Sequence, residues 1–273
     1  MIKKIWLFWD TMENPLLVDK CIKQIYKLHS DYEINFMNLD NFKKFTGDKL
    51  PKNFDSLGIT FKTDWIRCKV VAENGGFWID ASIYISKPLH EWINPDCDLY
   101  CMKHPACEKQ IENWFFYSPK DSTIVNKWLE EYEKALEIGQ EKYVDMRLEE
   151  YSLEQDKDYC GGNYLFHQLA LIVVTINYNY KIVKDNYGFN YQPFVSKYQL
   201  INNICIKNNK LNDPLYKFRG TERGYFDSYY SFIGFINPLS LIGELGLNTN
   251  YFSFMMIIIY ITIFYFIKKN KVR

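Results

Sequence analysis

The spacing of apolar residues changes repeatedly along the first part of the chain, and each change predicts a new element. Short apolar runs at residues 2–8 and 33–39 predict strands, and an amphipathic stretch at residues 16–29 predicts a helix between them. Residues 41–45 are expected to form a further short helix. Strands that alternate with helices in this way predict an α/β fold.

The same alternation continues downstream. Residues 98–103 and 114–117 predict strands, and Ser122 is expected to cap a helix that ends near Gly139. Residues 140–160 are rich in acidic side chains, so we expect a solvated insert or a helical flap over a cleft. Residues 164–176 are apolar enough for a buried helix but too short to cross a membrane.

One stretch of the chain combines a charged pair with a helix stop. Thr63 is expected to be a helix N-cap, which would place Asp64 in the first turn, where the helix dipole favours a carboxylate. Arg67 follows three residues later and shares a helix face with Asp64. Gly75 and Gly76 then stop the helix. The spacing predicts a carboxylate acceptor beside a rigid fork of donors.

A buried strand follows the two glycines. The apolar run at residues 77–79 predicts the strand, and Asp80 comes directly after it. Because open α/β sheets bind ligands at the carboxyl ends of their strands, Asp80 is a candidate ligand for a metal ion or a ribose. Two simpler interpretations stay open: Asp64 and Arg67 form an ordinary helix-face pair worth about a few tenths of a kcal/mol, or Asp80 is a turn residue.

These residues carry a resemblance to a known family. The pattern D-x-x-R followed by G-G-x-W-x-D-x-S, from Asp64 to Ser82, resembles the sugar-donor motif of the DXD-type glycosyltransferases, especially the capsular polysaccharide synthesis proteins allied to glycosyltransferase family 32. Residues 4–10, 21–32 and 111–115 resemble further family segments, as do residues 162–167, and all keep the family order. The similarity covers roughly residues 2–220.

The resemblance implies a fold and a reaction. It implies a single GT-A-like domain at residues 1–225 with a Rossmann-type mixed sheet. The implied reaction moves a hexose-type residue from a nucleoside diphosphate sugar to a glycan or lipid-linked acceptor, with retention of the anomeric configuration. The implied cofactor is Mn²⁺ or Mg²⁺.

The resemblance also implies roles for residues of this chain. The expected catalytic residues are Asp64, Arg67 and Asp80. The expected donor-binding residues are Trp6, Phe8, Asp64, Arg67, Gly75, Gly76, Asp80, Lys217 and Arg219, with Trp6 or Phe8 close to the base. Asn113 and Trp114 are expected near the acceptor cleft, and Asp80 with Ser82 is expected to hold the metal ion. His167 either faces the cleft or is a buried helix histidine with satisfied partners.

One departure from the family pattern stands at Ser82, where the full motif has a second aspartate. A hydroxyl group is a weaker ligand for a hard cation than a carboxylate, so metal dependence stays open. The same departure motivates an alternative function, a catalytically degenerate membrane-bound protein that binds sugar or serves as a scaffold. A nucleotide-sugar hydrolase is a third interpretation.

Composition narrows the range of partners. The 33 basic and 33 acidic residues cancel, so no overall field attracts nucleic acid, and we expect no nucleic-acid partner. The 7 cysteines are an odd number without an evident secretory signal, which predicts free thiols rather than a disulfide framework. The spacing of Cys97, Cys101, His104 and Cys107 fits no standard zinc module.

The carboxyl end of the sequence predicts a membrane anchor. Residues 251–267 contain no charge and predict a transmembrane helix. Such a helix spans roughly 25 Å, and its aromatic ends with the basic tail at residues 268–273 could cover the remaining thickness. Residues 226–250 are expected to form a juxtamembrane segment. We expect a single-pass anchor with the catalytic domain on the cytoplasmic side; a hairpin with residues 229–245 and a buried core helix are the alternatives.

Overall fold

The computed structural model describes residues 1–11, 14–187 and 213–218. The chain divides into two compact units. The first comprises Met1–Asn14, Cys21–Phe189 and Pro214–Lys217, and the second comprises Pro15–Lys20, Asn190–Asp213 and Phe218–Arg273. The predicted juxtamembrane segment, transmembrane helix and basic tail lie outside the described residues. No helix within the described ranges is long and apolar enough to cross a membrane.

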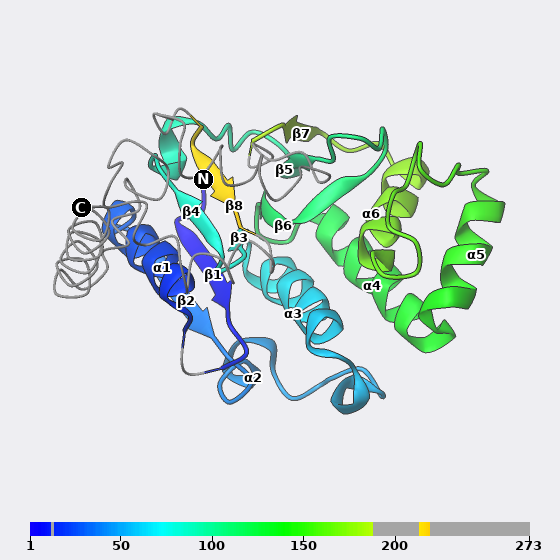
Figure 1. Cartoon of the computed structure of the whole chain (residues 1–273), viewed down its shortest axis with the longest axis horizontal. Coiled ribbons are helices and arrows are strands. Elements are labelled where there is room, and N and C mark those ends of the chain that lie inside the picture. Colours follow the sequence, from blue (N-terminus) through cyan, green and yellow to red (C-terminus); the bar gives the residue numbers. More distant parts are fainter. Residues whose placement is uncertain (12–13, 188–212, 219–273) are drawn as a thin grey trace, which may run out of the picture. The chain divides into compact units, whose positions relative to one another are not determined.

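The described residues form strands and helices that alternate only at the start of the chain (Figure 1). The strands are β1 (Lys4–Phe8), β2 (Glu33–Met37), β3 (Gly76–Ile79), β4 (Ile83–Ile85), β5 (Leu99–Lys103), β6 (Ile111–Ser118), β7 (Ile182–Asp185) and β8 (Leu215–Lys217). The helices are α1 (Leu16–Leu28), α2 (Lys43–Thr46), α3 (Ile59–Asn74), α4 (Thr123–Ile138), α5 (Gln140–Glu150) and α6 (Phe166–Asn177). Two short 3₁₀ turns occupy Phe54–Ser56 and Leu89–Glu91.

The first unit is built on a mixed sheet with six strands in the order β2-β1-β3-β6-β5-β7. Strand β1 is parallel to β2 and β3, and β5 is parallel to β7. Strand β6 is antiparallel to both of its neighbours. A separate pair joins β4 and β8 in antiparallel register. The predicted α/β class and mixed sheet are confirmed.

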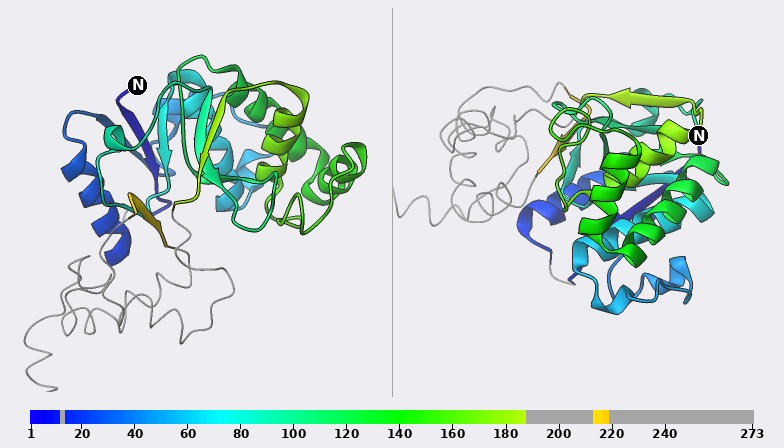
Figure 2. Two further views of the ribbon diagram at one scale, coloured as in Figure 1. Left: turned by 90° about the horizontal axis from the view of Figure 1, so that it is seen from above. Right: turned by 90° about the vertical axis from the view of Figure 1, so that its right-hand side faces the viewer.

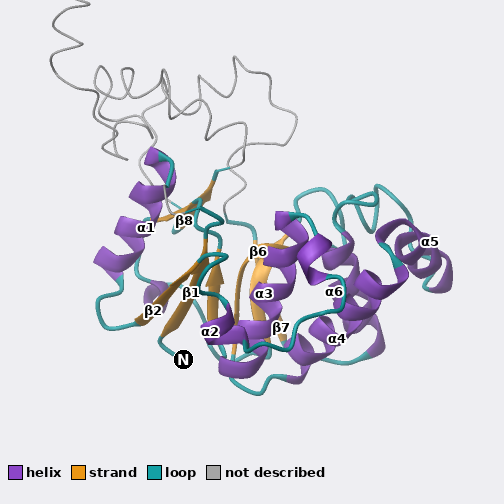
Figure 3. Cartoon of the chain, turned by 90° about the horizontal axis from the view of Figure 1, so that it is seen from below, coloured by secondary structure: helices purple, strands orange, loops and turns teal. Residues whose placement is uncertain are grey.

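Helices α3–α6 pack together beside this sheet. Helix α3 packs on β1, β3 and β6, while α6 packs on β6. Helix α4 packs against α3 and α6, and α5 packs against α4 and α6. Figure 3 shows these helices gathered on one side of the strands, and Figure 2 shows α4–α6 grouped in green. The layers join through the fully buried side chains of Trp65, Trp78 and Trp128, each of which stabilises the fold by on the order of 2 kcal/mol.

Several predicted boundaries agree with the structure, and one capping detail does not. Helix α4 ends at Ile138, directly before Gly139, as the sequence predicted, and Gly139 has a φ of +92°. Ser122 occupies the N-cap position, but its hydroxyl donates to the carbonyl of Asp98 at 3.1 Å instead of accepting from the helix. Its hydroxyl therefore ties α4 to the start of β5. Residues 140–150 of the predicted insert or flap form α5, and its placement over an acceptor cleft stays a prediction.

Candidate functional site

Helix α3 carries the charged pair and begins earlier than predicted. Its first residue is Ile59, and Gly58 is the N-cap. The expectation that Thr63 caps the helix is wrong, because Thr63 lies inside the helix and its hydroxyl donates to the carbonyl of Ile59 at 2.8 Å. Such a bond to the preceding turn is how a threonine is accommodated within a helix. The helix dipole acts most strongly in the first turn, and Asp64 lies beyond that turn.

Two consecutive glycines turn the chain from α3 into β3. Gly75 has a φ of +68° and Gly76 a φ of +98°, a region that side chains rarely adopt. A Cβ atom on Gly75 would lie 2.5 Å from the backbone nitrogen of Lys120, and one on Gly76 would lie 2.5 Å from the carbonyl oxygen of Lys4. Glycine is therefore required sterically at both positions. Their predicted contact with a donor stays a prediction.

Asp80 follows β3 at its carboxyl end and joins three elements. Its backbone nitrogen donates to the carbonyl of Trp114 at 2.9 Å, which ties it to β6. Its Oδ1 accepts from the indole nitrogen of Trp78 at 2.9 Å and lies 3.4 Å from Nη2 of Arg67. Its Oδ2 pairs with the Nζ of Lys217 at 2.6 Å. Arg67, Asp80 and Lys217, all among the predicted donor-binding residues, therefore lie together in the structure, and their contact with a donor stays a prediction.

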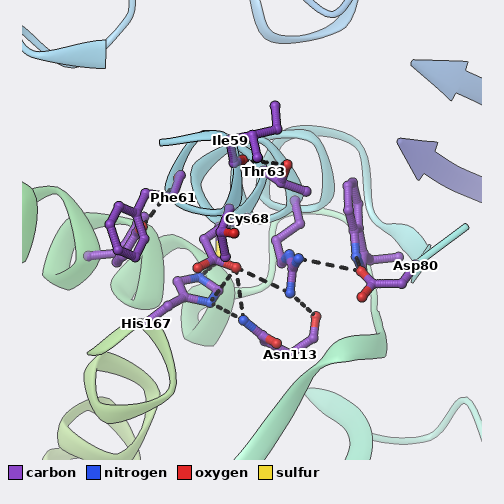
Figure 4. Close-up of polar contacts among 12 residues, drawn as sticks. Ile59, Phe61, Thr63, Cys68, Asp80, Asn113 and His167 are labelled. Carbon is purple, nitrogen blue, oxygen red and sulfur yellow. Dashed lines mark hydrogen bonds and ion pairs between the residues drawn. The ribbon is translucent and has the colours of Figure 1, made fainter. Parts of the chain in front are cut away.

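Asp64 joins the same cluster from the other side of Arg67. Its Oδ1 lies 3.3 Å from Nη1 of Arg67 and accepts from the side-chain amide of Asn113 at 3.0 Å. The carbonyl of Asn113 accepts from Nη1 of Arg67 at 2.8 Å. Figure 4 shows His167 at one end of this network, Asp80 at the other and Asn113 between them. Among the described residues, Asn113 and Arg67 both contact Oδ1 of Asp64 and leave its Oδ2 for a ligand.

His167 extends the network into the core. The amide of Asn113 donates to its Nδ1 at 2.9 Å, so the ring proton sits on Nε2, which lies 3.1 Å from the Sγ of Cys68. Its ring stacks on Trp128 with centroids 4.3 Å apart. Burial first, and then the charge of Arg67, hold the pKa of His167 well below its usual value. His167 is therefore a neutral, fully buried helix histidine whose partner Asn113 holds Asp64.

The two carboxylates of the cluster titrate in opposite directions. Burial raises the pKa of Asp64 to about 6, against the attraction of Arg67. Burial also acts to raise the pKa of Asp80, but the charges of Lys217 and Arg67 outweigh it and hold that pKa below its usual value. Asp80 therefore stays ionised throughout the neutral range, whereas Asp64 takes up a proton in mild acid.

One donor of the cluster has no hydrogen-bond partner among the residues that the structure describes. The Nε of Arg67 is buried without a hydrogen-bond partner, and buried donors are normally satisfied. The guanidinium lies over the ring of Trp78 at 5.2 Å from its centroid, which fixes its plane. The side chain of Asp80 is 22% exposed, against 5% for Asp64. The arrangement can therefore take up a ligand that carries hydroxyl and anionic groups.

The remaining predicted site residues take different positions. Trp6 lies in the core and its indole nitrogen donates to the carbonyl of Gly75 at 2.9 Å, while Phe8 is also buried. The ring of Trp114 lies 5.8 Å from the Nζ of Lys217. Arg219 lies outside the described residues. The nucleotide contact predicted for Trp6 and Phe8 stays a prediction.

The residues predicted to hold the metal ion offer few suitable donors in the described part of the chain. Asp80 offers a carboxylate, but Arg67, Trp78 and Lys217 already engage its two oxygens. Ser82 is 3% exposed and adds only a neutral hydroxyl. A hard divalent cation prefers several charged or carbonyl oxygens. These residues do not fit the predicted Mn²⁺ or Mg²⁺ site.

The cysteine prediction is corrected at one place. Cys107 and Cys160 form a disulfide, which ties the β5–β6 loop to the segment before α6. The sequence distance of 53 residues gave no local signal of this pairing. Cys97 and Cys101 are free and buried, whereas the nitrogen and sulfur atoms of His104, Cys107 and Cys160 lie within 4.8 Å of one another.

Comparison with protein families decides the affiliation of the chain. The model of the capsular polysaccharide synthesis protein family matches residues 1–195. The chain belongs to this family. The resemblance inferred from the D-x-x-R and G-G-x-W-x-D-x-S patterns is thereby confirmed, and membership supports the predicted enzyme class, a glycosyltransferase. No curated protein matches the sequence.

Solved structures with a distant likeness to this capsular polysaccharide synthesis protein are also glycosyltransferases. PaToxG glycosyltransferase has a TM-score of 0.41 and 14% identity over 62% of this chain and 67% of its own. The galactosyltransferase LgtC, in complex with donor and acceptor sugar analogs, has a TM-score of 0.40 and 13% identity over 80% of this chain and 87% of its own. These likenesses are too distant to assign residues or substrates.

Proposed function

We propose that this capsular polysaccharide synthesis protein is a glycosyltransferase that moves a hexose-type residue from a nucleoside diphosphate sugar to a glycan or lipid-linked acceptor. The observation that supports it most is the cluster of Asp64, Arg67 and Asp80 at the carboxyl end of β3. Open α/β sheets bind their ligands at this edge. Family membership supports the same reaction class.

Each member of the cluster has a chemical role in this proposal. Asp64 accepts a hydroxyl of the donor sugar through Oδ2, while Asn113 and Arg67 hold Oδ1 in place. Arg67 donates to the sugar or to a phosphate oxygen, since its fork is rigid and its Nε is unpaired. Lys217 and Arg67 stabilise negative charge as the diphosphate departs.

The proposed reaction exchanges one bond for another without oxidation or reduction. The bond between the anomeric carbon and the diphosphate oxygen breaks, and a bond from the anomeric carbon to the acceptor hydroxyl oxygen forms. The hydroxyl proton passes to the departing diphosphate. We propose retention of configuration because the sequence motif resembles families that retain it. Most of the rate enhancement is assigned to charge stabilisation at the diphosphate.

A product assay tests this proposal. The full chain in detergent is incubated with UDP-, GDP- and dTDP-linked hexoses, and release of nucleoside diphosphate is measured with and without a bacterial membrane lipid extract as acceptor. The proposal predicts release with one donor that increases with acceptor. Release that ignores the acceptor identifies a hydrolase. Binding without release identifies a degenerate sugar-binding or scaffold protein.

We further propose that residues 251–267 anchor the protein in a membrane with the amino-terminal domain on the cytoplasmic side. The uncharged run and the basic tail support the anchor. The disulfide between Cys107 and Cys160 is the opposing observation, because disulfides are rare in the cytosol, and an accessible label on intact cells would overturn the cytoplasmic orientation. Labelling a cysteine introduced at Tyr164, which is 57% exposed, with a membrane-impermeant maleimide on intact cells separates the two orientations.

A further inference from the structure

Both carboxylate oxygens of Asp80 are engaged by cationic or polar groups of the protein itself. Oδ2 pairs with the Nζ of Lys217 at 2.6 Å. Oδ1 accepts from Trp78 and lies 3.4 Å from Arg67. The side chains of Asp80 and Lys217 are 22% and 15% exposed, so the ion pair lies where a ligand can reach it. A metal ion at this carboxylate would compete with an ammonium already in place.

The position of Lys217 is set by strand pairing. The backbone nitrogen of Ile83 donates to the carbonyl of Asp80 at 2.9 Å, so β4 begins directly after the Asp80 turn. Strand β8 pairs with β4 in antiparallel register, with Lys217 opposite Ile83. The backbone nitrogen of Ser86 continues this pairing with a bond of 2.9 Å to the carbonyl of Pro214. Figure 1 shows β8 beside β4. The register of the strand therefore brings the ammonium to Asp80.

Among the described residues around Asp80, few other groups suit a divalent cation. Ser82 is neutral, and Oδ1 of Asp64 is held by Asn113 and Arg67. In the described part of the chain, the one close group of three histidine, cysteine or acidic side chains comprises His104, Cys107 and Cys160, which lie on other segments and whose two sulfurs are joined in a disulfide. Mg²⁺ and Mn²⁺ favour carboxylate, carbonyl and water oxygens.

The charges of the cluster already balance. Asp64 and Asp80 are offset by Arg67 and Lys217, and His167 is neutral because of its burial. A divalent ion on Oδ2 of Asp80 would stand next to the ammonium and raise the local charge by two. Like charges this close repel strongly in a site of low dielectric constant. An ion could bind well only if Lys217 moved away.

We propose that the ammonium of Lys217 is the cation of the donor site, so that this glycosyltransferase transfers sugar without a divalent metal ion. The inference rests on the proposed function. It gives Lys217 the role of neutralising the diphosphate, which the family resemblance gave to Mn²⁺ or Mg²⁺. Asp80 is then the group that orients the ammonium. Lys217 stabilises the diphosphate oxygens as the anomeric bond breaks.

Metal depletion of the unaltered full chain is the first test. Sugar transfer from the active donor is measured in EDTA and then with added Mn²⁺ or Mg²⁺. The inference predicts equal rates, within about twofold, under all conditions. Loss of transfer in EDTA that Mn²⁺ restores would overturn it and leave the proposed function intact. Absence of transfer under every condition, with no binding of UDP or GDP by calorimetry, would instead overturn the proposed function.

A charge-deleting variant is the second test. Lys217→Met removes the ammonium and frees Oδ2 of Asp80, so the rate in EDTA should fall by about 100-fold to 1,000-fold, as for loss of one charge-stabilising donor. Mn²⁺ should restore part of this loss in Lys217→Met and should leave the rate of the unaltered chain unchanged. Lys109→Met is the matched control, because Lys109 also pairs with a nearly buried carboxylate, that of Asp158 at 3.2 Å. Full activity of a folded Lys217→Met protein in EDTA would contradict the inference.

Discussion

Replacing Asp64 by asparagine is predicted to stabilise the protein while it removes sugar transfer. The side chain of Asp64 is 5% exposed, and its burial raises its pKa from 3.8 to about 6. Asparagine has nearly the same shape and carries no charge to desolvate. The variant keeps an acceptor oxygen for the amide of Asn113. A functional residue that costs stability is typical of a binding site.

The size of the stability change follows from the raised pKa of Asp64. Because the pKa rises from 3.8 to about 6, ionisation of Asp64 lowers the free energy of unfolding by about 3 kcal/mol in total. About 1 kcal/mol of this decrease falls between about pH 5 and about pH 7. Because the folded state holds the proton more tightly, the contribution of Asp64 to stability is complete below its ordinary pKa. That contribution is lost as the pH rises through about 6.

Urea denaturation of the full chain in detergent, followed by tryptophan fluorescence across this pH range, measures the difference between the two proteins. The unaltered chain should lose stability relative to Asp64→Asn as the pH rises. Asp145→Asn, at an exposed position of α5, is the control and should show no such divergence. A variant that is less stable at pH 7, with a pH profile parallel to that of the unaltered chain, would refute the reasoning.

Three further outcomes are expected. In urea melts, Gly76→Ala should lower the free energy of unfolding by several kcal/mol more than Gly47→Ala. Both residues have a positive φ, but only the new Cβ at Gly76 meets backbone, at 2.5 Å. Equal losses of stability would contradict this. Reduction of the Cys107–Cys160 disulfide should lower stability by about 4 kcal/mol in the same assay, from the entropy of a loop of this length, and an unchanged midpoint with dithiothreitol would contradict that pairing. Trp78→Phe removes a donor to a charged acceptor and should raise KM for the donor in steady-state kinetics by about tenfold or more; an unchanged KM in a folded variant would count against the described contact.

The fold was predictable where elements are long and their pattern is regular. Helix α4 and strand β5 lie where the apolar spacing and Gly139 placed them. The strands β4, β7 and β8 have 3, 4 and 3 residues, too few to show a period. The pairing of β4 with β8 also joins segments distant in sequence. Its register, which brings Lys217 to Asp80, is a tertiary property.

The sequence predicted the charged cluster of the site but not the polar residues that hold it. Asp64, Arg67 and Asp80 are linked by helix and strand spacing, so local pattern was sufficient to bring them together. The bridge through Asn113 to His167 joins residues 49 and 54 positions apart. One signal could have pointed to it: His167 stands in an apolar helix, and a buried polar side chain requires a partner. No local pattern identifies that partner as Asn113.

The central claim concerns the carboxylate at the end of β3, and Asp80→Asn tests it most directly. Transfer of labelled sugar from the active donor is measured for the unaltered full chain and for Asp80→Asn, with circular dichroism to verify that both are folded. The account predicts a rate at least about 100-fold lower in the variant, because the amide cannot hold Lys217 and Arg67 by charge. Undiminished transfer by a folded Asp80→Asn protein would contradict it.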